Sequence, residues 1–155
     1  MPKLRFIPVS GTTDVTQNMY VWEWGDDMVV VDCGVGFPAA EMFGVDFVIP
    51  DFSYVRENKS KLRGILVSHG HEDHLGALPF LLNEVQAPIY ATKLVAGFIE
   101  DKLKEYNIPH QKINILNPDE EVGVRLGAFR IDSFRVSSSF VLASASFETA
   151  AFQSF

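Results

Sequence analysis

The sequence predicts one domain of mixed α+β structure, and three observations lead to that class. Residues 4–9, 19–24 and 28–31 are short apolar runs rich in β-branched or aromatic side chains, which is typical of strands. Residues 93–106 instead repeat apolar side chains at helical spacing. The chain has 155 residues, of which 47% are hydrophobic and 21% are charged, and this is enough for a single globular domain with a sizeable core.

The first three strands are expected to form a β-meander. A polar loop at residues 10–18 separates the first two strands, and the glycine and aspartates of residues 25–27 make the turn into the third. Residues 34–61 contain glycine, proline and aromatic side chains without clear periodicity. We therefore expect them to form an irregular loop that packs over the edge of the sheet.

The middle of the chain predicts a buried strand that runs into a helix. Residues 64–67 are apolar and β-branched, and the apolar spacing of residues 75–82 suits a helix entered near His74, with Pro79 close to its start. A short strand is then expected at residues 88–91. Thr92 is suited to cap the helix that follows it.

The last part of the chain is expected to add one long helix and more strands. The helix covers residues 93–106, and its expected apolar face consists of Leu94, Phe98, Ile99 and Leu103. The further strands are predicted at residues 112–116, 121–124 and 128–134.

Residues 68–74 carry three imidazoles and two carboxylates directly after a predicted strand, a pattern that indicates a metal site. The candidate ligands are His69, His71, Asp73 and His74. Neutral imidazole and carboxylate suit zinc, with manganese as the alternative. His69 and His71 can close on one ion, whereas Asp73 and His74 are offset from them and suit a second ion roughly 3.5–4 Å away.

A surface turn is the competing interpretation of these residues, and for a lone histidine it is the commoner one. The density of ligand types in this turn favours the metal site instead. Asp32, at the end of the third predicted strand, has two equally weighted interpretations. It is either an ordinary turn former before Cys33 and Gly34, or a carboxylate that fixes the tautomer of a ligand histidine.

The turn and several flanking segments resemble known families. Residues 69–77 match the signature of the metallo-β-lactamase superfamily, and the longer pattern is similar to ribonuclease J, carried by Asn18 and Met19 and by residues 29–34, 44–46 and 49–54. The resemblance implies a four-layered αββα sandwich, here its N-terminal part only. It also implies two divalent ions that activate a water for attack on RNA, and a buttressing role for Asp32.

The end of the chain departs from the ribonuclease J pattern. Residues 1–136 are expected to form a partial metallo-β-lactamase-like domain, whereas residues 137–155 do not resemble the family. Ser138 stands where ribonuclease J has a histidine that completes the first metal site, and a hydroxyl is a poor zinc ligand. We therefore expect a fragment with an altered end rather than a truncated homologue. Alone, it should cleave RNA poorly or not at all.

Three functions remain open. The first is a metal-dependent ribonuclease with an RNA substrate, in which Asp73 is the catalytic group that orients or deprotonates the attacking water. The second is a non-catalytic metal-binding domain, which Ser138 supports. The third is another hydrolase of the superfamily that acts on a lactam, thioester or lactone.

The charge distribution limits how RNA can be bound. A net charge of −7 argues against a generic nucleic-acid-coating protein, so an RNA-binding protein of this composition needs local basic patches. The one candidate patch comprises Arg56, Lys59, Lys61 and Arg63. A solvated charged linker is the alternative for these residues.

Composition also bears on location. No apolar run approaches the roughly 20 residues of a membrane helix, and the N-terminus lacks the apolar region of a signal peptide. The single cysteine, Cys33, excludes an internal disulfide and is expected to be a small buried residue. We expect a cytoplasmic protein with no membrane partner, and a homo-oligomer is an open expectation for the intact protein.

Overall fold

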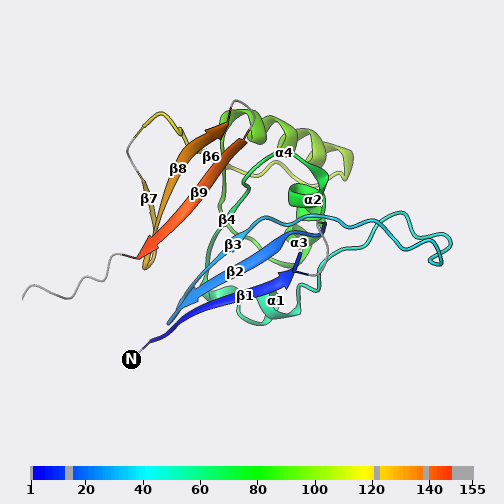
Figure 1. Cartoon of the computed structure of the whole chain (residues 1–155), viewed down its shortest axis with the longest axis horizontal. Helices are drawn as coiled ribbons and strands as arrows, with labels where there is room; N and C mark the ends of the chain where they lie inside the picture. The colour runs from blue at the N-terminus through cyan, green and yellow to red at the C-terminus, as the bar shows by residue number, and fades with distance from the viewer. Residues whose placement is uncertain (1, 13–15, 121–122, 138–139, 148–155) are drawn as a thin grey trace, which may run out of the picture.

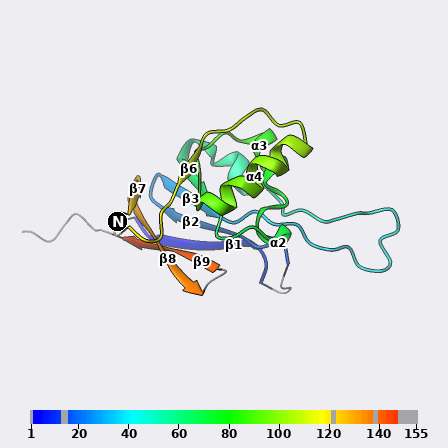
Figure 2. The same ribbon diagram turned by 90° about the horizontal axis from the view of Figure 1, so that it is seen from above.

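The computed structural model describes residues 2–12, 16–120, 123–137 and 140–147, with side chains as far as residue 134. Figures 1 and 2 show three layers, in which helices cover one face of a larger sheet and a smaller sheet covers the other face. The larger sheet has the strand order β1-β2-β3-β4-β5-β6 and the smaller one the order β7-β8-β9. The α+β class is confirmed, and these layers are three of the four layers of an αββα sandwich.

The strands and helices have the following bounds. The strands of the larger sheet are β1 Leu4–Ser10, β2 Met19–Trp24, β3 Asp27–Val31, β4 Leu62–Leu66, β5 Ile89–Ala91 and β6 Ile113–Ile115. The strands of the smaller sheet are β7 Val124–Leu126, β8 Phe129–Ser137 and β9 Phe140–Phe147. The helices are α1 Ser53–Glu57, α2 Glu72–Leu75, α3 Leu78–Glu84 and α4 Lys93–Glu105, with a 3-10 turn at Lys59–Lys61.

The direction of the strands in the larger sheet explains where a functional site forms. β1, β2 and β3 pair antiparallel, so the predicted meander is confirmed. β4 then lies parallel to β3, and β5 and β6 continue in the same direction. The carboxyl ends of these four strands therefore lie at one edge of the sheet, and this edge is where ligands bind in many α/β sheets.

Two hydrophobic clusters hold the layers together. The larger cluster lies between the helices and the larger sheet, and includes the fully buried Met19, Ile65, Leu81 and Ile99. The smaller cluster joins the two sheets and is centred on Phe129. Since alternate residues of a strand point to opposite faces, Ile65 and Leu66 of β4 each serve a different cluster.

The predicted helix at residues 75–82 is wrong in one respect, because the structure divides this stretch into α2 and α3. Pro79 lies in the first turn of α3, where its missing N–H costs no helical hydrogen bond. Gly76 and Ala77 separate the two helices. The expected entry near His74 holds, because α2 contains that residue.

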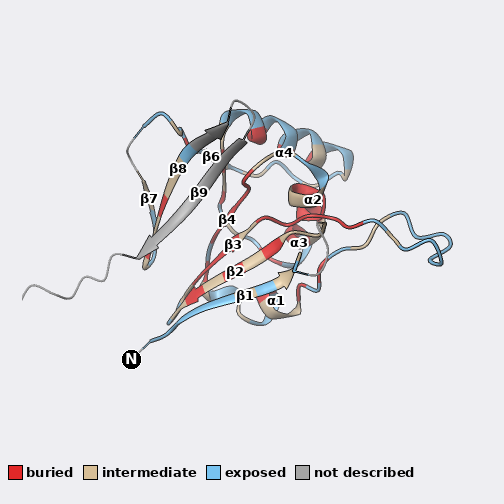
Figure 3. Ribbon diagram, viewed as in Figure 1, coloured by how far each residue is buried: buried red, intermediate tan, exposed pale blue. Residues whose placement is uncertain are grey.

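The expected packing of residues 34–61 over the sheet edge is also wrong in part. Residues 37–47 project away from the body of the molecule, and Figure 3 shows this loop mostly exposed. Phe43 in this loop is 92% exposed. The segment also contains α1, a one-turn helix that sequence periodicity could not reveal because only Val55 in it is buried.

The predicted apolar face of α4 is partly wrong. Ile99 and Leu103 are buried as expected, but Leu94 and Phe98 are 70% and 48% exposed. The helix instead turns Val95 toward the sheet, so the buried stripe follows positions 95, 99 and 103. Thr92 does occupy the N-cap position, although no side-chain cap hydrogen bond forms there within the described residues.

The smaller sheet differs from the prediction at both ends. The strand expected at residues 121–124 begins later, as β7, and residues 121–122 lie outside the described part. Within the segment expected to be atypical, β9 pairs with the length of β8. Ser138 itself lies outside the described residues.

Among the described helices, none is both long and apolar enough to cross a membrane.

A buried carboxylate links β2 to α1 and to the turn before β4. Glu23 is 4% exposed, and its oxygens accept hydrogen bonds from Tyr54 at 2.6 Å, Arg5 at 3.1 Å and Lys61 at 3.3 Å. Burial alone would raise the pKa of Glu23, but the Tyr54 hydroxyl and the charge of Lys61 outweigh it. The pKa of Glu23 therefore lies below its ordinary value of 4.5.

We expect Glu23→Gln to lower the free energy of unfolding at neutral pH by about 1–2 kcal/mol, because the ion pairs are lost while the cations regain water. A lowered folded-state pKa means that the ionised Glu23 stabilises the fold above about pH 4.5, and that this contribution disappears as the pH falls through the folded pKa. Urea unfolding of both proteins at pH 7 and pH 3.5 measures this. The exposed Glu41→Gln serves as the control, and an equal loss at both pH values would contradict the prediction.

Candidate metal centre

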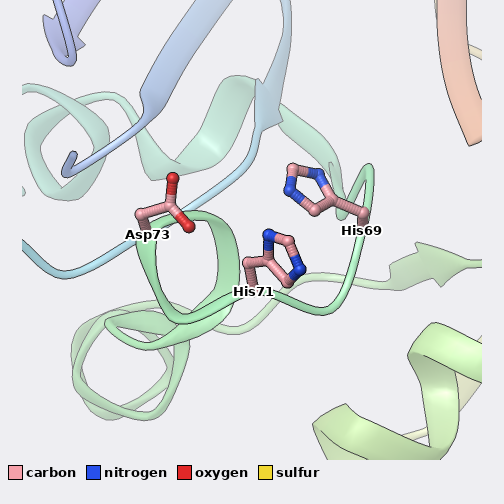
Figure 4. A group of neighbouring side chains, drawn as sticks. All are labelled: His69, His71 and Asp73. Atoms are coloured by element: carbon pink, nitrogen blue, oxygen red, sulfur yellow. The ribbon is translucent and has the colours of Figure 1, made fainter. Parts of the chain in front are cut away.

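The predicted ligands lie on the turn from β4 into α2, so the expected strand-to-helix position is confirmed. Figure 4 shows His69 and His71 on the loop and Asp73 on the first turn of the helix. One ligand atom from each of these three side chains lies within 4.8 Å of the others. The strand delivers the loop to the carboxyl edge of the sheet, where these three side chains gather.

His74 lies against the same group. Its Nε2 atom is 3.3 Å from Oδ2 of Asp73, and its ring centroid is 3.7 Å from that of His69. The structure thus brings all four predicted ligands together, with Asp73 adjacent both to the His69–His71 pair and to His74. The division of these ligands between two ions stays a prediction.

Asp32 is the buried support of the cluster. Its Oδ1 atom accepts the backbone N–H of Ser68 at 2.7 Å, and its Oδ2 atom accepts the Ser68 hydroxyl at 2.8 Å. Oδ2 also lies 2.8 Å from Nδ1 of His74. The backbone of Asp32 has a φ of +61°, a left-handed conformation that aspartate tolerates better than most residues. Asp32 therefore contacts the turn that carries the candidate ligands directly, as the buttressing interpretation requires.

These contacts set the tautomers of two histidines. A carboxylate accepts hydrogen bonds only, so the Nδ1 atom of His74 carries the proton and Nε2 keeps its lone pair. The Ser68 hydroxyl uses its hydrogen on Asp32 and can accept one from Nδ1 of His69, 3.0 Å away. Both rings then present Nε2 as the atom that can bind a metal. Ser68 was missed by the sequence reasoning, although its position directly before His69 is a usable indication.

Electrostatics favour the neutral form of His69. Burial lowers its pKa, and the neighbouring His74 lowers it further, while Asp32 acts in the opposite direction. Neutral imidazole is the form that binds transition metals. The donor set of imidazole nitrogens and a carboxylate therefore fits zinc or manganese. Closing on one ion with bonds of about 2.1 Å requires the donors to lie about 3.4 Å apart, so a pair at the upper limit of 4.8 Å would have to approach by about 1.4 Å.

The segment after β3 fastens α2 to the sheet. The N–H of Cys33 donates to the carbonyl of His74 at 2.7 Å, and the N–H of Val35 donates to that of Glu72 at 2.9 Å. Gly34 lies between them and packs directly on the backbone of Asp73. Cys33 is buried as predicted, and burial raises the pKa of its thiol well above 9.0, so it stays neutral and is unsuited to be a ligand.

The candidate basic patch lies away from the cluster and is largely neutralised. Arg56, Lys61 and Arg63 form ion pairs with Glu84, Glu23 and Asp27, respectively. These cations precede or begin β4, whereas the metal turn follows its end, about 15 Å further along a five-residue strand. The charged-linker alternative is therefore supported over an RNA-binding patch.

The sequence matches the family model of the metallo-β-lactamase superfamily over residues 12–138. The chain belongs to this superfamily, as the fold and the cluster also indicate. It is similar to Ribonuclease J 2 of Staphylococcus saprophyticus and of Staphylococcus aureus, with 39% identity over 136 residues in each case. The match covers 88% of this chain and 24% of each relative, so the chain spans about a quarter of their length.

Solved structures support the same fold. The metallo-β-lactamase fold protein YhfI from Bacillus subtilis superposes with a TM-score of 0.61 at 20% identity, covering 94% of this chain and 58% of that one. The short form of human tRNase Z gives a TM-score of 0.53 at 14% identity, covering 95% and 65%. The flavodiiron protein of Giardia intestinalis gives 0.55 at 12% identity, covering 83% and 30%.

Proposed function

We propose that this chain is the metal-binding part of a ribonuclease that cleaves RNA phosphodiesters, as a 5′–3′ exonuclease, an endonuclease or both. The observation that carries the proposal is the convergence of His69, His71 and Asp73 in a chain 39% identical to Ribonuclease J 2. Two divalent cations are the proposed cofactors, zinc first and manganese as the alternative, with His69, His71, Asp73 and His74 as ligands.

The cations, the histidines and Asp73 would contribute differently to the proposed chemistry. Bound cations would supply Lewis acidity and lower the pKa of a water molecule. His69 and His74 present Nε2 toward the site because Ser68 and Asp32 take their Nδ1 hydrogens. The Asp73 carboxylate is the proposed group that orients the attacking water and accepts its proton, as its position between the histidines allows.

The test compares substrates at fixed metal content. The chain is loaded with Zn²⁺ or Mn²⁺ and incubated with end-labelled single-stranded RNA or with a thioester, beside Asp73→Ala. We expect slow, metal-dependent RNA cleavage that Asp73→Ala abolishes, and no thioester hydrolysis. The rate should be low because Ser138 replaces a histidine in the resembling pattern. Thioester turnover, or RNA cleavage that survives in Asp73→Ala, would contradict the proposal.

A non-catalytic metal-binding domain is the second candidate, and Ser138 is the observation that favours it. A serine hydroxyl leaves the first ion with fewer good ligands than a hydrolytic site needs. Full metal occupancy with no hydrolysis of either substrate would support this candidate over the ribonuclease.

The remaining parts of the proposal concern setting and partners. RNA is the proposed partner. We do not assign its binding to Arg56, Lys61 and Arg63, because these cations are already paired with carboxylates. We also propose a cytoplasmic location and a homo-oligomeric intact protein. Residues 1–136 are the proposed partial domain, and residues 137–155 the atypical segment.

A further inference from the structure

We propose that Asn18, held by a hydrogen bond from Tyr20, is a positioning residue that keeps the Asp73 carboxylate and the His74 ring in place for metal binding. The inference rests on the proposed metal function of these two side chains. Neither Asn18 nor Tyr20 has a role in the chemistry described above. Asn18 directly precedes β2 and Tyr20 lies in its first part, and Asn18 is 55 residues before Asp73 in sequence.

The backbone of Asn18 is fixed on both sides. Its N–H donates to the carbonyl of Asp73 at 2.9 Å, and its carbonyl accepts the N–H of Gly34 at 3.0 Å. The side-chain amide reinforces the first contact, because Nδ2 donates to the same Asp73 carbonyl at 3.1 Å. Asn18 is thereby clamped against the first turn of α2, and its amide has little freedom to move away.

The amide nitrogen lies between two acceptors that would otherwise repel each other. Nδ2 of Asn18 is 3.3 Å from Oδ2 of Asp73 and 3.2 Å from Nε2 of His74. Those two acceptor atoms are only 3.3 Å apart. With the His74 proton on Nδ1, a carboxylate oxygen faces an imidazole lone pair in the metal-free chain, and the amide hydrogens stabilise this arrangement. A bound cation would take the Nε2 lone pair, and the amide would keep its contacts with Asp73.

Asp73 and Tyr20 together set which end of the amide faces the cluster. The carbonyl and carboxylate oxygens of Asp73 only accept hydrogen bonds, so the amide turns its nitrogen toward them. Its oxygen then faces Tyr20, whose hydroxyl donates to Oδ1 at 2.8 Å and also lies 3.3 Å from the carbonyl oxygen of Gly11. A flipped amide would place an oxygen against the carboxylate. The Tyr20 ring is itself stacked on Phe6 at 5.8 Å, which keeps the hydroxyl in place. Burial raises the pKa of Tyr20, so the hydroxyl stays a donor at neutral pH.

The experiment measures Co²⁺ affinity and the visible d–d absorption of bound Co²⁺, which reports ligand geometry. The variants are Tyr20→Phe and Asn18→Ala. Their matched controls are Tyr54→Phe, which removes a hydroxyl bonded to Glu23, and Asn58→Ala, which removes an amide bonded to the Tyr54 carbonyl. We expect about a tenfold loss of Co²⁺ affinity for Tyr20→Phe, up to about a hundredfold for Asn18→Ala, altered d–d bands in both, and changes below about twofold in the controls.

Wild-type affinity and an unchanged Co²⁺ spectrum in Tyr20→Phe would overturn the inference, because this variant removes one oxygen atom and leaves the ring packing intact. Equal losses in Tyr20→Phe and Tyr54→Phe would also overturn it, since they would indicate a general loss of stability. RNA cleavage by the wild-type chain is measured separately. If the wild-type chain cleaves RNA and Tyr20→Phe keeps wild-type Co²⁺ affinity, only the positioning role is rejected. If the variants lose Co²⁺ affinity as expected but the wild-type chain does not cleave RNA, only the ribonuclease proposal is rejected.

Discussion

Replacing His71 with alanine is expected to weaken metal binding by roughly a hundredfold or more, because the variant loses a nitrogen ligand from a site with few donors. His71 is exposed and lies at the N-cap of α2, so the fold should tolerate the change. Elemental analysis of the purified proteins, followed by equilibrium dialysis against Zn²⁺, measures the effect. Thermal unfolding of the two metal-free proteins checks that their stabilities agree.

The matched control for His71→Ala is His110→Ala, since His110 is also exposed and lies in a loop beyond α4. We expect this variant to keep the metal content of the wild-type chain. If the wild-type chain and His71→Ala both contained equally little metal, the assignment of the turn as a metal site would be lost.

A methyl group at Gly34 is expected to destabilise the domain by about 3 kcal/mol or more, at the upper end of the usual cost of overpacking. A Cβ there would lie 1.7 Å from the carbonyl oxygen of Asp73 and 2.6 Å from the nitrogen of His74. Both are backbone atoms that cannot rotate aside, so the segment and α2 must separate. Urea unfolding of Gly34→Ala measures the stability, and Zn²⁺ affinity should fall with it.

Gly97→Ala is the matched control for Gly34→Ala. Gly97 lies within α4, and no described atom beyond its own helix lies within 4 Å of the position that its Cβ would take. Alanine should therefore stabilise this helix by roughly 0.5–1 kcal/mol. A Gly34→Ala protein as stable as the wild type would contradict the close approach of residues 32–36 to α2.

Local patterns in the sequence were enough to predict most of the strands, α4 and the turn that carries the candidate ligands. β2 occupies the predicted residues 19–24, because alternation of buried and partly exposed side chains is a local property. The four candidate ligands could be chosen because they are close together in the chain. Of the contacts that fix them, the one from Asp32 was an open interpretation that only the resemblance favoured, and those of Ser68 and Asn18 were not predicted. Asp32 and Ser68 are 36 residues apart and Asn18 and Asp73 are 55 apart, so local spacing does not reveal these contacts.

The wrong predictions for α4 and for the loop at residues 37–47 have one physical cause. Tertiary packing decides which apolar side chains are buried, and local spacing allows more than one choice. The spacing of α4 allows two adjacent apolar stripes, and only the sheet beneath the helix selects the one with Val95. Phe98 remains on the outer side, where its ring lies over Gly70 of the metal turn. The exposure of the projecting loop at residues 37–47 could not be predicted either, because apolar residues such as Phe43 usually predict burial.

The shortness of α2 ties the metal turn to the cooperativity of the whole domain. A helix of four residues has too few internal hydrogen bonds to persist alone, so its shape depends on Cys33, Val35 and Asn18. Asn18 precedes β2, and Cys33 and Val35 follow β3, so we expect local opening of the turn to accompany loss of these ends of β2 and β3. By linkage, each factor of ten in cation concentration above the dissociation constant raises the global free energy of unfolding by about 1.4 kcal/mol.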